Sequence, residues 1–231
     1  MTHALDVALY DYGAGNLHSL GKALEAAGAS VTVTSDWERA LAADALVLPG
    51  VGAFGQAAAA LPDDRSAIRS ALEAGLPCLG ICLGMQLFFE RSDESDGRGI
   101  GLVPGEVVHL KADVVPHMGW NDVETEVDPL FDGIDGLVAY YANSYVCVPD
   151  EDGPVIARST YGGGSFAAGV RRANAWGVQF HPEKSSQQGR RMIANFVAEA
   201  ARIAGGASAS GMGGSGARSG EGEEAGGEAR P

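Results

Sequence analysis

Apolar, β-prone runs alternate with helical segments through the first part of the chain, and this alternation constrains the fold more than any other feature. Predicted strands cover residues 4–10, 31–34 and 44–48, and a further apolar run opens at residue 76. Predicted helices lie between them at residues 16–27, directly after Asp36, and at residues 56–61 and 63–74. Regular alternation of strand and helix is typical of a parallel sheet with helices on both faces. Function in such sheets gathers at the carboxyl ends of the strands.

The second half of the chain has a different pattern. Short β-prone runs predict strands at residues 105–110, 114–116, 121–123, 137–141, 155–160, 166–171 and 175–180. Glycine-rich residues 97–101 and 162–164 are typical of turns, and helical spacing returns at residues 185–203. We therefore predict a three-layer α/β protein. It would have a mostly parallel sheet with flanking helices, plus additional antiparallel strands in the second half.

The end of the chain has a composition of its own. Residues 205–231 are mainly Gly, Ala, Ser and Glu, with almost no large apolar side chain. Such a segment cannot bury enough apolar surface to offset its loss of conformational entropy. We expect one folded domain over residues 1–204 and a disordered tail over residues 205–231. An acidic interaction tail is the alternative.

Charge and cysteine usage narrow the function classes. The formal net charge of -14 argues against nucleic acid and anionic membrane surfaces as partners, because both favour an excess of Lys and Arg. The start of the chain lacks the basic and long apolar regions of a secretion signal, and no apolar stretch is long enough to cross a bilayer. The three cysteines show no disulfide-framework spacing, so the expected setting is a reducing cytoplasm.

Residues 76–90 contain the strongest chemical motif, Gly80-Ile-Cys82-Leu-Gly84, between a predicted strand and a predicted helix. Gly-x-Cys-x-Gly in this context is the thiol form of a nucleophile elbow, in which a sharp turn lifts one side chain clear of the sheet. The following helix would direct its free N–H groups and its dipole at the sulfur, which favours the thiolate. The alternative is that Cys82 is a small buried core residue, as free cysteines often are.

A cysteine nucleophile needs a base and a group that orients the base. Among five histidines, His181 fits this role best, because it follows an apolar strand and stands in His181-Pro-Glu183. Pro182 stiffens the spacing, so Glu183 can accept from one ring nitrogen while the other faces the thiol. The alternative is a strand-end loop with a surface histidine and glutamate.

An oxyanion hole needs backbone N–H groups aimed at one point. Leu83, the residue after the nucleophile, can supply one donor. The loop of Pro49, Gly50, Val51 and Gly52 ends another strand and can supply the second. The alternative for this loop is a plain Pro-Gly turn.

A zinc site is the other interpretation of the cysteines. Cys78, Cys82 and Cys147, with one histidine, could supply four ligands. However, Cys78 lies inside the apolar run, and the chain has no CxxC or HxxxH pair, so the spacing falls short of a structural zinc site. We expect no metal and no cofactor.

Taken together, these motifs resemble those of the class I, triad-type glutamine amidotransferases. The resemblance is carried by Gly80-Ile-Cys-Leu-Gly-Met-Gln86, Pro49-Gly-Val-Gly52 and His181-Pro-Glu183. Within that group, the chain is similar to the glutaminase subunits of imidazole glycerol phosphate synthase. The segments that carry this similarity are Asp11-Tyr-Gly-Ala-Gly-Asn16, Pro49-Gly-Val-Gly-Ala-Phe-Gly55, Pro116-His-Met-Gly-Trp-Asn121 and His181-Pro-Glu-Lys-Ser185. The similarity extends from about Val7 to about Ala200 and leaves the tail outside it.

The resemblance implies a function and a role for each matching residue. Cys82 would be the nucleophile, His181 the general base and acid, and Glu183 the residue that orients it. Residues implied to hold the glutamine are Gly52, Gln86, Glu94, Ser144 and Tyr145. Residues implied to face the partner are Trp120, Asn121, Tyr140 and Lys184. That partner would be a cyclase subunit with a (β/α)8 barrel, in a heterodimer, where the ammonia is used to make imidazole glycerol phosphate and an aminoimidazole carboxamide ribotide.

One position departs from the family pattern. The family commonly has His-Ser/Thr-Tyr where this chain has Asn143-Ser-Tyr145. The change is either a tolerated polar substitution or one that alters substrate affinity or coupling to the partner. Three other functions stay open from the sequence: a different Cys-His hydrolase such as a γ-glutamyl hydrolase, a glutaminase that feeds another synthase, and a non-catalytic binding module.

Overall fold

The structure is a computed structural model that describes residues 4–13, 17–50 and 52–211. In the first half of the chain the strands are β1 (Asp6–Tyr10), β2 (Ser30–Thr34), β3 (Ala45–Leu48) and β4 (Cys78–Ile81). The helices are α1 (His18–Ala26), α2 (Trp37–Leu41), α3 (Phe54–Ala59), α4 (Ser66–Glu73) and α5 (Leu83–Gln86). The predicted alternation of strand and helix is confirmed, with boundaries that differ by a few residues.

The second half is mainly strands. They are β5 (Arg91–Ser92), β6 (Ser95–Arg98), β7 (Gly105–His109), β8 (His117–Thr125), β9 (Leu137–Asn143), β10 (Tyr145–Pro149), β11 (Val155–Tyr161), β12 (Gly164–Arg172) and β13 (Ala175–Val178). Two short 3-10 turns, η1 (Pro129–Phe131) and η2 (Pro182–Lys184), and the long helix α6 (Ser186–Gly211) complete the described chain.

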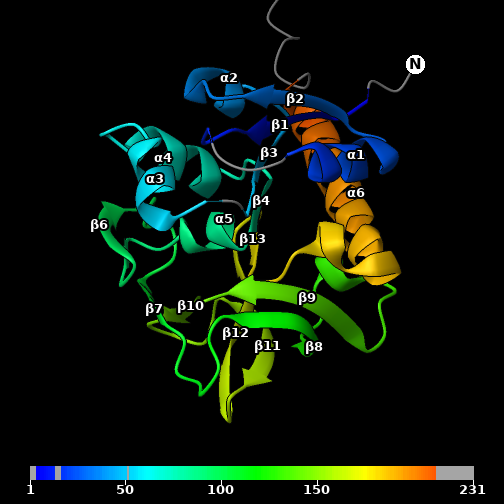
Figure 1. Cartoon of the computed structure of the whole chain (residues 1–231). Coiled ribbons are helices and arrows are strands. Elements are labelled where there is room, and N and C mark those ends of the chain that lie inside the picture. The colour runs from blue at the N-terminus through cyan, green and yellow to red at the C-terminus, as the bar shows by residue number, and fades with distance from the viewer. Residues whose placement is uncertain (1–3, 14–16, 51, 212–231) are drawn as a thin grey trace, which may run out of the picture.

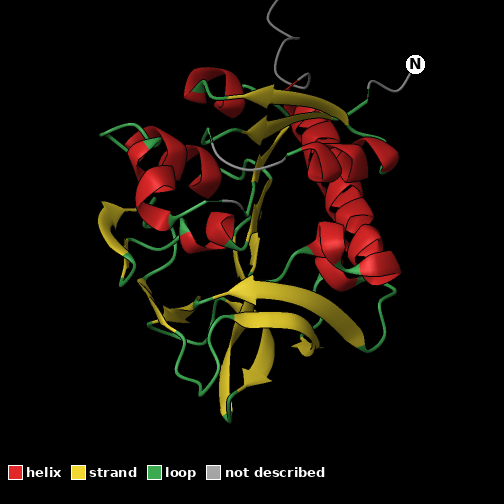
Figure 2. Ribbon diagram, in the orientation of Figure 1, coloured by secondary structure: helices red, strands yellow, loops and turns green. Residues whose placement is uncertain are grey.

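One sheet joins the two halves, in the order β2-β1-β3-β4-β13-β12-β10-β7-β5-β6. Strands β2, β1, β3, β4 and β13 are parallel to one another, whereas β12, β10 and β7 continue the sheet in antiparallel pairs. Strand β11 pairs with β12 and with β8, and β8 pairs with β9, so these strands lead away from the main sheet (Figure 2). The predicted fold class is confirmed.

Helices cover both faces of the parallel part of the sheet. Helices α1 and α6 lie on one side and α3, α4 and α5 on the other (Figure 1). Alternate residues of β1 show the two cores: Val7 and Leu9 pack with Leu24 and Phe196, whereas Ala8 and Tyr10 pack with the α3–α5 side. Because successive strand residues point to opposite faces, a strand buried on both sides must be apolar throughout.

The neighbouring strands β4 and β13 decide where the chemistry lies. They are parallel, with Val178 opposite Ile81. Cys82 follows β4 directly, and Gln179 and His181 follow β13. The end of the strand before the cysteine and the end of the strand before the histidine therefore meet at one edge of the sheet.

Several predicted elements differ from the structure. Residues 114–116 form a bend, because Pro116 cannot donate to a strand ladder, and the predicted strand at 121–123 is part of the longer β8. Strand β10 was absent from the prediction. So was the β5–β6 hairpin, whose polar sequence carries no β signal and which reaches into the predicted turn at 97–101. The predicted helix after Cys82 is only the single turn α5, so the helix dipole behind the sulfur is smaller than expected.

Helix α6 extends to Gly211, past the predicted boundary at residue 204. Residues 212–231 of the predicted tail lie outside the described residues. None of the helices in the described part of the chain is both long and apolar enough to span a lipid bilayer.

Candidate active site

Cys82 occupies a strained turn between β4 and α5. Its backbone has φ 48° and ψ −103°, a conformation that side-chain-bearing residues rarely adopt. Its N–H donates to Val178 O at 2.6 Å, which ties the turn to β13. The side chain is almost fully buried, with 7% exposed. The elbow predicted from Gly-x-Cys-x-Gly is thus present in the backbone.

Close backbone packing explains the glycines around this turn. A Cβ at Gly84 would lie 2.0 Å from Leu48 O, so no side chain fits there. A Cβ at Gly80 would lie 2.7 Å from the backbone of Gly84. The elbow can therefore sit against β3 only with glycine on both sides of the cysteine.

His181 and Glu183 form the expected pair. His181 Nδ1 lies 2.8 Å from Glu183 Oε1, and the imidazole is almost fully buried. The His181 backbone N–H donates to Tyr140 O at 2.8 Å, and Ser185 Oγ donates to His181 O at 2.6 Å. These contacts fix the start of η2, so the position of the ring is set by β9 as well as by β13.

The pKa of His181 is raised to about 9. Burial alone would lower this pKa, but hydrogen bonds and charge interactions with Cys82 and Glu183 raise it by more. At neutral pH the imidazole is therefore protonated, with Glu183 on one side and the sulfur of Cys82 on the other. A protonated imidazole beside a sulfur is the arrangement that holds a reactive thiolate.

A cavity of about 340 Å³ opens over these residues. It is lined by Gly50, Gly52, Cys82, Leu83, Gln86, Glu94, Ala142, Asn143, Ser144, Tyr145, His181 and Lys184. These include all of the residues that sequence predicted to hold substrate or form the oxyanion hole, except Val51. Val51 lies outside the described residues. A cavity of this size suits a single amino-acid side chain and its backbone groups.

Glu94 and Gln86 connect the cavity to neighbouring elements. Glu94 Oε2 accepts from Phe54 N at 2.7 Å, which anchors the β5–β6 hairpin to the first residue of α3. Gln86 is buried, and its Nε2 donates to Tyr145 O at 3.3 Å and to Gln179 Oε1 at 3.4 Å. Both side chains thus line the cavity and also fix its walls.

Asn143, the position that departs from the family pattern, is buried in the wall of the cavity. Its Nδ2 donates to Tyr145 O at 3.0 Å. Among the described residues, no hydrogen-bond partner lies within reach of its buried Oδ1.

The predicted partner-facing residues divide into two groups. Trp120 on β8 lies opposite Tyr140 on β9, with ring centroids 6.0 Å apart, and Lys184 Nζ lies 5.9 Å from the Tyr140 ring centre. Trp120 is 55% exposed and Met118, on the same face of β8, is 64% exposed. We call Met118, Trp120, Tyr140 and Lys184 the aromatic patch.

Asn121 differs from the expectation. Strand alternation places it on the opposite face of β8 from Trp120. Its Nδ2 donates to Thr160 O at 3.0 Å, and its Oδ1 accepts from Asp122 N at 2.9 Å. Its amide is therefore bonded within the chain, and we leave Asn121 out of the aromatic patch.

One residue beside Cys82 was missed from the sequence. Gln179 is fully buried and its Nε2 lies 3.4 Å from Cys82 Sγ. Its position two residues before His181 was the available signal, since strand residues two apart share a face. His117, which does not line the cavity, is buried and stacks between Tyr141 and Tyr161, at centroid distances of 4.6 and 3.9 Å. Burial lowers its pKa.

The other thiols do not share these features. Cys78 and Cys147 are fully buried, and burial raises the pKa of each thiol. Buried thiols in apolar surroundings are inert. Among the described residues, no group of three or more His, Cys, Asp and Glu side chains is arranged to hold a metal ion.

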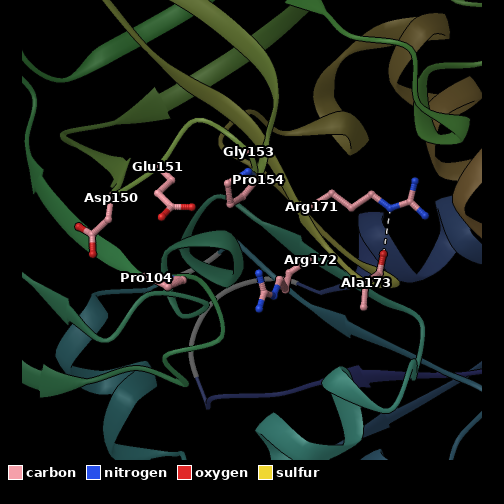
Figure 3. A pocket seen from close by; sticks show the side chains of 8 residues that line it. All are labelled: Pro104, Asp150, Glu151, Gly153, Pro154, Arg171, Arg172 and Ala173. Atoms are coloured by element: carbon pink, nitrogen blue, oxygen red, sulfur yellow. Dashed lines mark hydrogen bonds between the residues drawn. The ribbon is translucent and has the colours of Figure 1, made fainter.

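A second cavity, of about 330 Å³, lies elsewhere on the protein (Figure 3). Its lining includes the carboxylates of Asp150 and Glu151 and the guanidinium of Arg172, with Arg171 Nε donating to Ala173 O at 2.9 Å. The residues that line it include neither a thiol nor an imidazole. Of these two cavities, only the one over Cys82 is lined by a thiol and an imidazole.

Comparison with known proteins gives the family that the sequence motifs resemble. The profile of the family "Glutamine amidotransferase class-I" matches residues 8–200. Imidazole glycerol phosphate synthase subunit HisH of Moorella thermoacetica is 47% identical over 196 residues, which cover 82% of this chain and 93% of that protein. The same subunit of Natronomonas pharaonis is 44% identical over 201 residues, which cover 83% and 94%.

Solved structures support the fold. The structure of PurLQS from Thermotoga maritima superposes with a TM-score of 0.68 at 20% identity, covering 85% of this chain and 99% of that one. The crystal structure of a glutamine amidotransferase gives a TM-score of 0.67 at 20% identity, covering 85% and 98%. At this level of identity the likeness concerns the fold alone.

Proposed function

The chain belongs to the class I glutamine amidotransferase family, and from this premise we propose that it is the glutaminase subunit of an imidazole glycerol phosphate synthase. It hydrolyses glutamine to glutamate and ammonia, in histidine biosynthesis. The observation that carries this proposal is the meeting of Cys82, His181 and Glu183 at one cavity, on the ends of the adjacent strands β4 and β13.

Each member of the triad has a separate task. The Cys82 thiolate attacks the side-chain carboxamide carbon of glutamine. Protonated His181 gives its proton to the departing nitrogen, so that ammonia leaves and a glutamyl thioester remains. His181, now neutral, takes a proton from water, and the attack of that water releases glutamate. Glu183 holds the ring through Nδ1, so Nε2 is the nitrogen that exchanges the proton.

The oxyanion formed in each step needs two donors. The Leu83 N–H is one, since this residue follows the nucleophile and lines the cavity. The second comes from the Pro49–Gly52 loop, whose Gly50 and Gly52 also line the cavity. Losing one such donor typically lowers the rate by about a hundred- to a thousand-fold. A rearrangement of this loop would therefore switch the enzyme on or off, and we infer that the free subunit has little activity.

The partner is a cyclase subunit with a (β/α)8 barrel, in a heterodimer. The names of the relatives are those of a subunit of imidazole glycerol phosphate synthase, which supports assembly with a second subunit. The aromatic patch is the docking surface on this chain, because it is exposed and contains the aromatic side chains on which interfaces depend. It also adjoins the triad, since the His181 N–H donates to Tyr140 O.

Two further parts of the proposal concern setting and organisation. A cysteine nucleophile works only where it stays reduced, which favours a cytoplasmic location. We also keep residues 1–204 as the amidotransferase domain and residues 205–231 as an appended tail, although helix α6 continues to Gly211.

Glutamate release from glutamine tests the proposed function. It is measured for the purified chain alone and with a barrel cyclase and its ribulosyl nucleotide substrate, for wild type, Cys82→Ala and the control Cys78→Ala. We expect strong stimulation by the partner, lost in Cys82→Ala and kept in Cys78→Ala. Robust activity that ignores the cyclase would assign the thiol chemistry to another amidotransferase, and preference for γ-glutamyl peptides would assign it to a hydrolase. No activity in any mixture would indicate a binding module.

A further inference from the structure

Gln179 is not a member of the triad, yet its side chain contacts the sulfur of Cys82. Its side chain is fully buried, and Nε2 lies 3.4 Å from Cys82 Sγ. We propose that Gln179 stabilises the Cys82 thiolate by donating an N–H to the sulfur. This proposal rests on the proposed function in one respect: it takes Cys82 as the residue that must be deprotonated.

The backbone fixes Gln179 beside Cys82. The parallel pairing of β13 with β4 places Val178 opposite Ile81, so the next residues along each strand, Gln179 and Cys82, are also neighbours. The Cys82 N–H donates to Val178 O at 2.6 Å. The Gln179 N–H donates to Ala168 O at 2.9 Å. The donor and the sulfur are therefore held by the sheet, and neither depends on a mobile loop.

A chain of hydrogen bonds decides which end of the Gln179 amide faces the sulfur. The Tyr145 carbonyl can only accept, so the Gln86 Nε2 must be the end that faces it, at 3.3 Å. That same Nε2 lies 3.4 Å from Gln179 Oε1, which must then be the acceptor. The Gln179 amide has only one end left for the sulfur, and that end is the N–H donor.

The carbonyl that orients the Gln86 amide also accepts a hydrogen bond from Asn143. The Asn143 Nδ2 donates to Tyr145 O, at 3.0 Å, so this carbonyl accepts from two side-chain amides. The Tyr145 carbonyl at the start of β10 is thus linked through Gln86 and Gln179 to the sulfur of Cys82. A buried amide that lacked partners would destabilise the protein, whereas here both ends of the Gln179 amide are bonded.

A neutral donor can stabilise negative charge on the Cys82 sulfur throughout the reaction, whereas His181 can do so only while it is protonated. When His181 gives its proton to the departing ammonia, the positive charge beside the sulfur disappears. When water then attacks the thioester, the sulfur leaves as a thiolate at a moment when His181 has only begun to regain a proton. The Gln179 N–H stays in place through every step, because an amide does not titrate.

The pH dependence of Cys82 alkylation by iodoacetamide tests this role, with the modified cysteine located by mass spectrometry. The variants are Gln179→Met, which keeps the volume and removes the donor, and Gln179→Glu, which keeps the acceptor for Gln86 and directs an acidic group at the sulfur. The matched control is Gln188→Met, because both ends of the Gln188 side-chain amide are also hydrogen-bonded, here to Val138 N, Asp135 O and Gly136 O, but away from the cavity.

We expect the midpoint of Cys82 alkylation to move upward by about one pH unit in Gln179→Met, so that at pH values below both midpoints the alkylation rate falls about ten-fold. Gln179→Glu should move the midpoint further, and Gln188→Met should not move it. A role limited to packing would lower thermal stability in Gln179→Met and leave the midpoint in place, and that result would overturn the proposal.

Glutamate release by unalkylated portions of the same protein preparations, with the cyclase present, separates this proposal from the proposed function. If wild type shows a low alkylation midpoint that depends on Gln179 but hydrolyses no glutamine, the proposed function fails and the role of Gln179 stands. If wild type hydrolyses glutamine and the midpoint is the same in Gln179→Met, the role of Gln179 fails and the proposed function stands.

Discussion

Gly50 packs against Cys82 so closely that a Cβ on Gly50 would lie 2.8 Å from the Cβ of Cys82. The same Cβ would lie 3.0 Å from His181 Cε1 and 2.8 Å from Ile81 O. Gly50, which lies just beyond the end of β3, is therefore in close contact with Cys82 and His181, the proposed nucleophile and base. We therefore expect a shift of Gly50 to displace both Cys82 and His181.

Gly50→Ala should lower glutaminase activity, measured with the cyclase, by about a hundred-fold or more, because the methyl group displaces Cys82, His181 or an oxyanion donor. Thermal unfolding of the same protein shows whether the fold persists. The control is Gly153→Ala, since a Cβ at Gly153 meets nothing within 4 Å. Unchanged kcat/KM in Gly50→Ala would contradict this close packing.

His181 should remain protonated up to about pH 9, well above the ordinary imidazole pKa of 6.5. An NMR titration of the His181 ring, assigned by its loss in His181→Gln, measures this midpoint. Because the imidazolium form protonates the departing ammonia, activity should fall as the pH rises through about 9. Glu183→Gln should lower the midpoint, since Glu183 is one of the groups that raise the pKa; an unchanged midpoint would show that it is not.

His117 should make the protein sensitive to acid. Burial lowers its pKa below the ordinary value, so as the pH falls below about 6.5 the unfolded chain takes up a proton before the folded one does. This difference favours unfolding at low pH. The test is urea unfolding at about pH 7.5 and about pH 5.5, on either side of the ordinary imidazole pKa. Between these two pH values, the unfolding free energy of wild type should fall by more than that of His117→Phe. The phenylalanine keeps the stacking with Tyr141 and Tyr161 but cannot take up a proton. Equal losses would argue against a buried neutral imidazole.

Asn143→Ala should raise KM for glutamine about three- to ten-fold and change kcat less. The substitution removes one of two side-chain donors to Tyr145 O and loosens a wall of the cavity, and a lost hydrogen bond is typically worth about 1 kcal/mol. Steady-state kinetics with the cyclase measures both constants. Asn195→Ala is the control, because Asn195 Nδ2 bonds to Leu130 O and Asp132 O outside the cavity. A selective loss of kcat would instead place Asn143 in the chemical step.

Trp120→Ala should weaken cyclase binding about ten- to a hundred-fold, because an exposed tryptophan in an aromatic cluster is the type of residue that dominates an interface. Calorimetric titration with the cyclase measures the affinity. Val127→Ala is the control: this apolar residue is fully exposed, but it lies beyond the end of β8. If both variants bind the cyclase like wild type, the docking surface lies elsewhere.

Local patterns in the sequence determined the parallel half of the fold and selected the three residues that we propose as the triad. The apolar runs that became β1, β3 and β4 are buried on both faces, so hydrophobicity alone marks them. Cys82 stands out because Gly80 and Gly84 flank it, and His181 because Pro182 and Glu183 follow it. In each case the residues that define the feature are neighbours in the chain.

Tertiary structure decided what depends on register and on contacts between distant segments. The alternation of β8 separates Trp120 from Asn121, although the two are adjacent in sequence, since successive strand residues point to opposite faces. The helix after Cys82 ends after one turn. There the hydrogen bonds change to a spacing of three residues, from Phe88 N to Met85 O and from Phe89 N to Gln86 O. Gln179 reaches the sulfur only because β13 pairs with β4, a contact between segments far apart in the chain that no local pattern encodes.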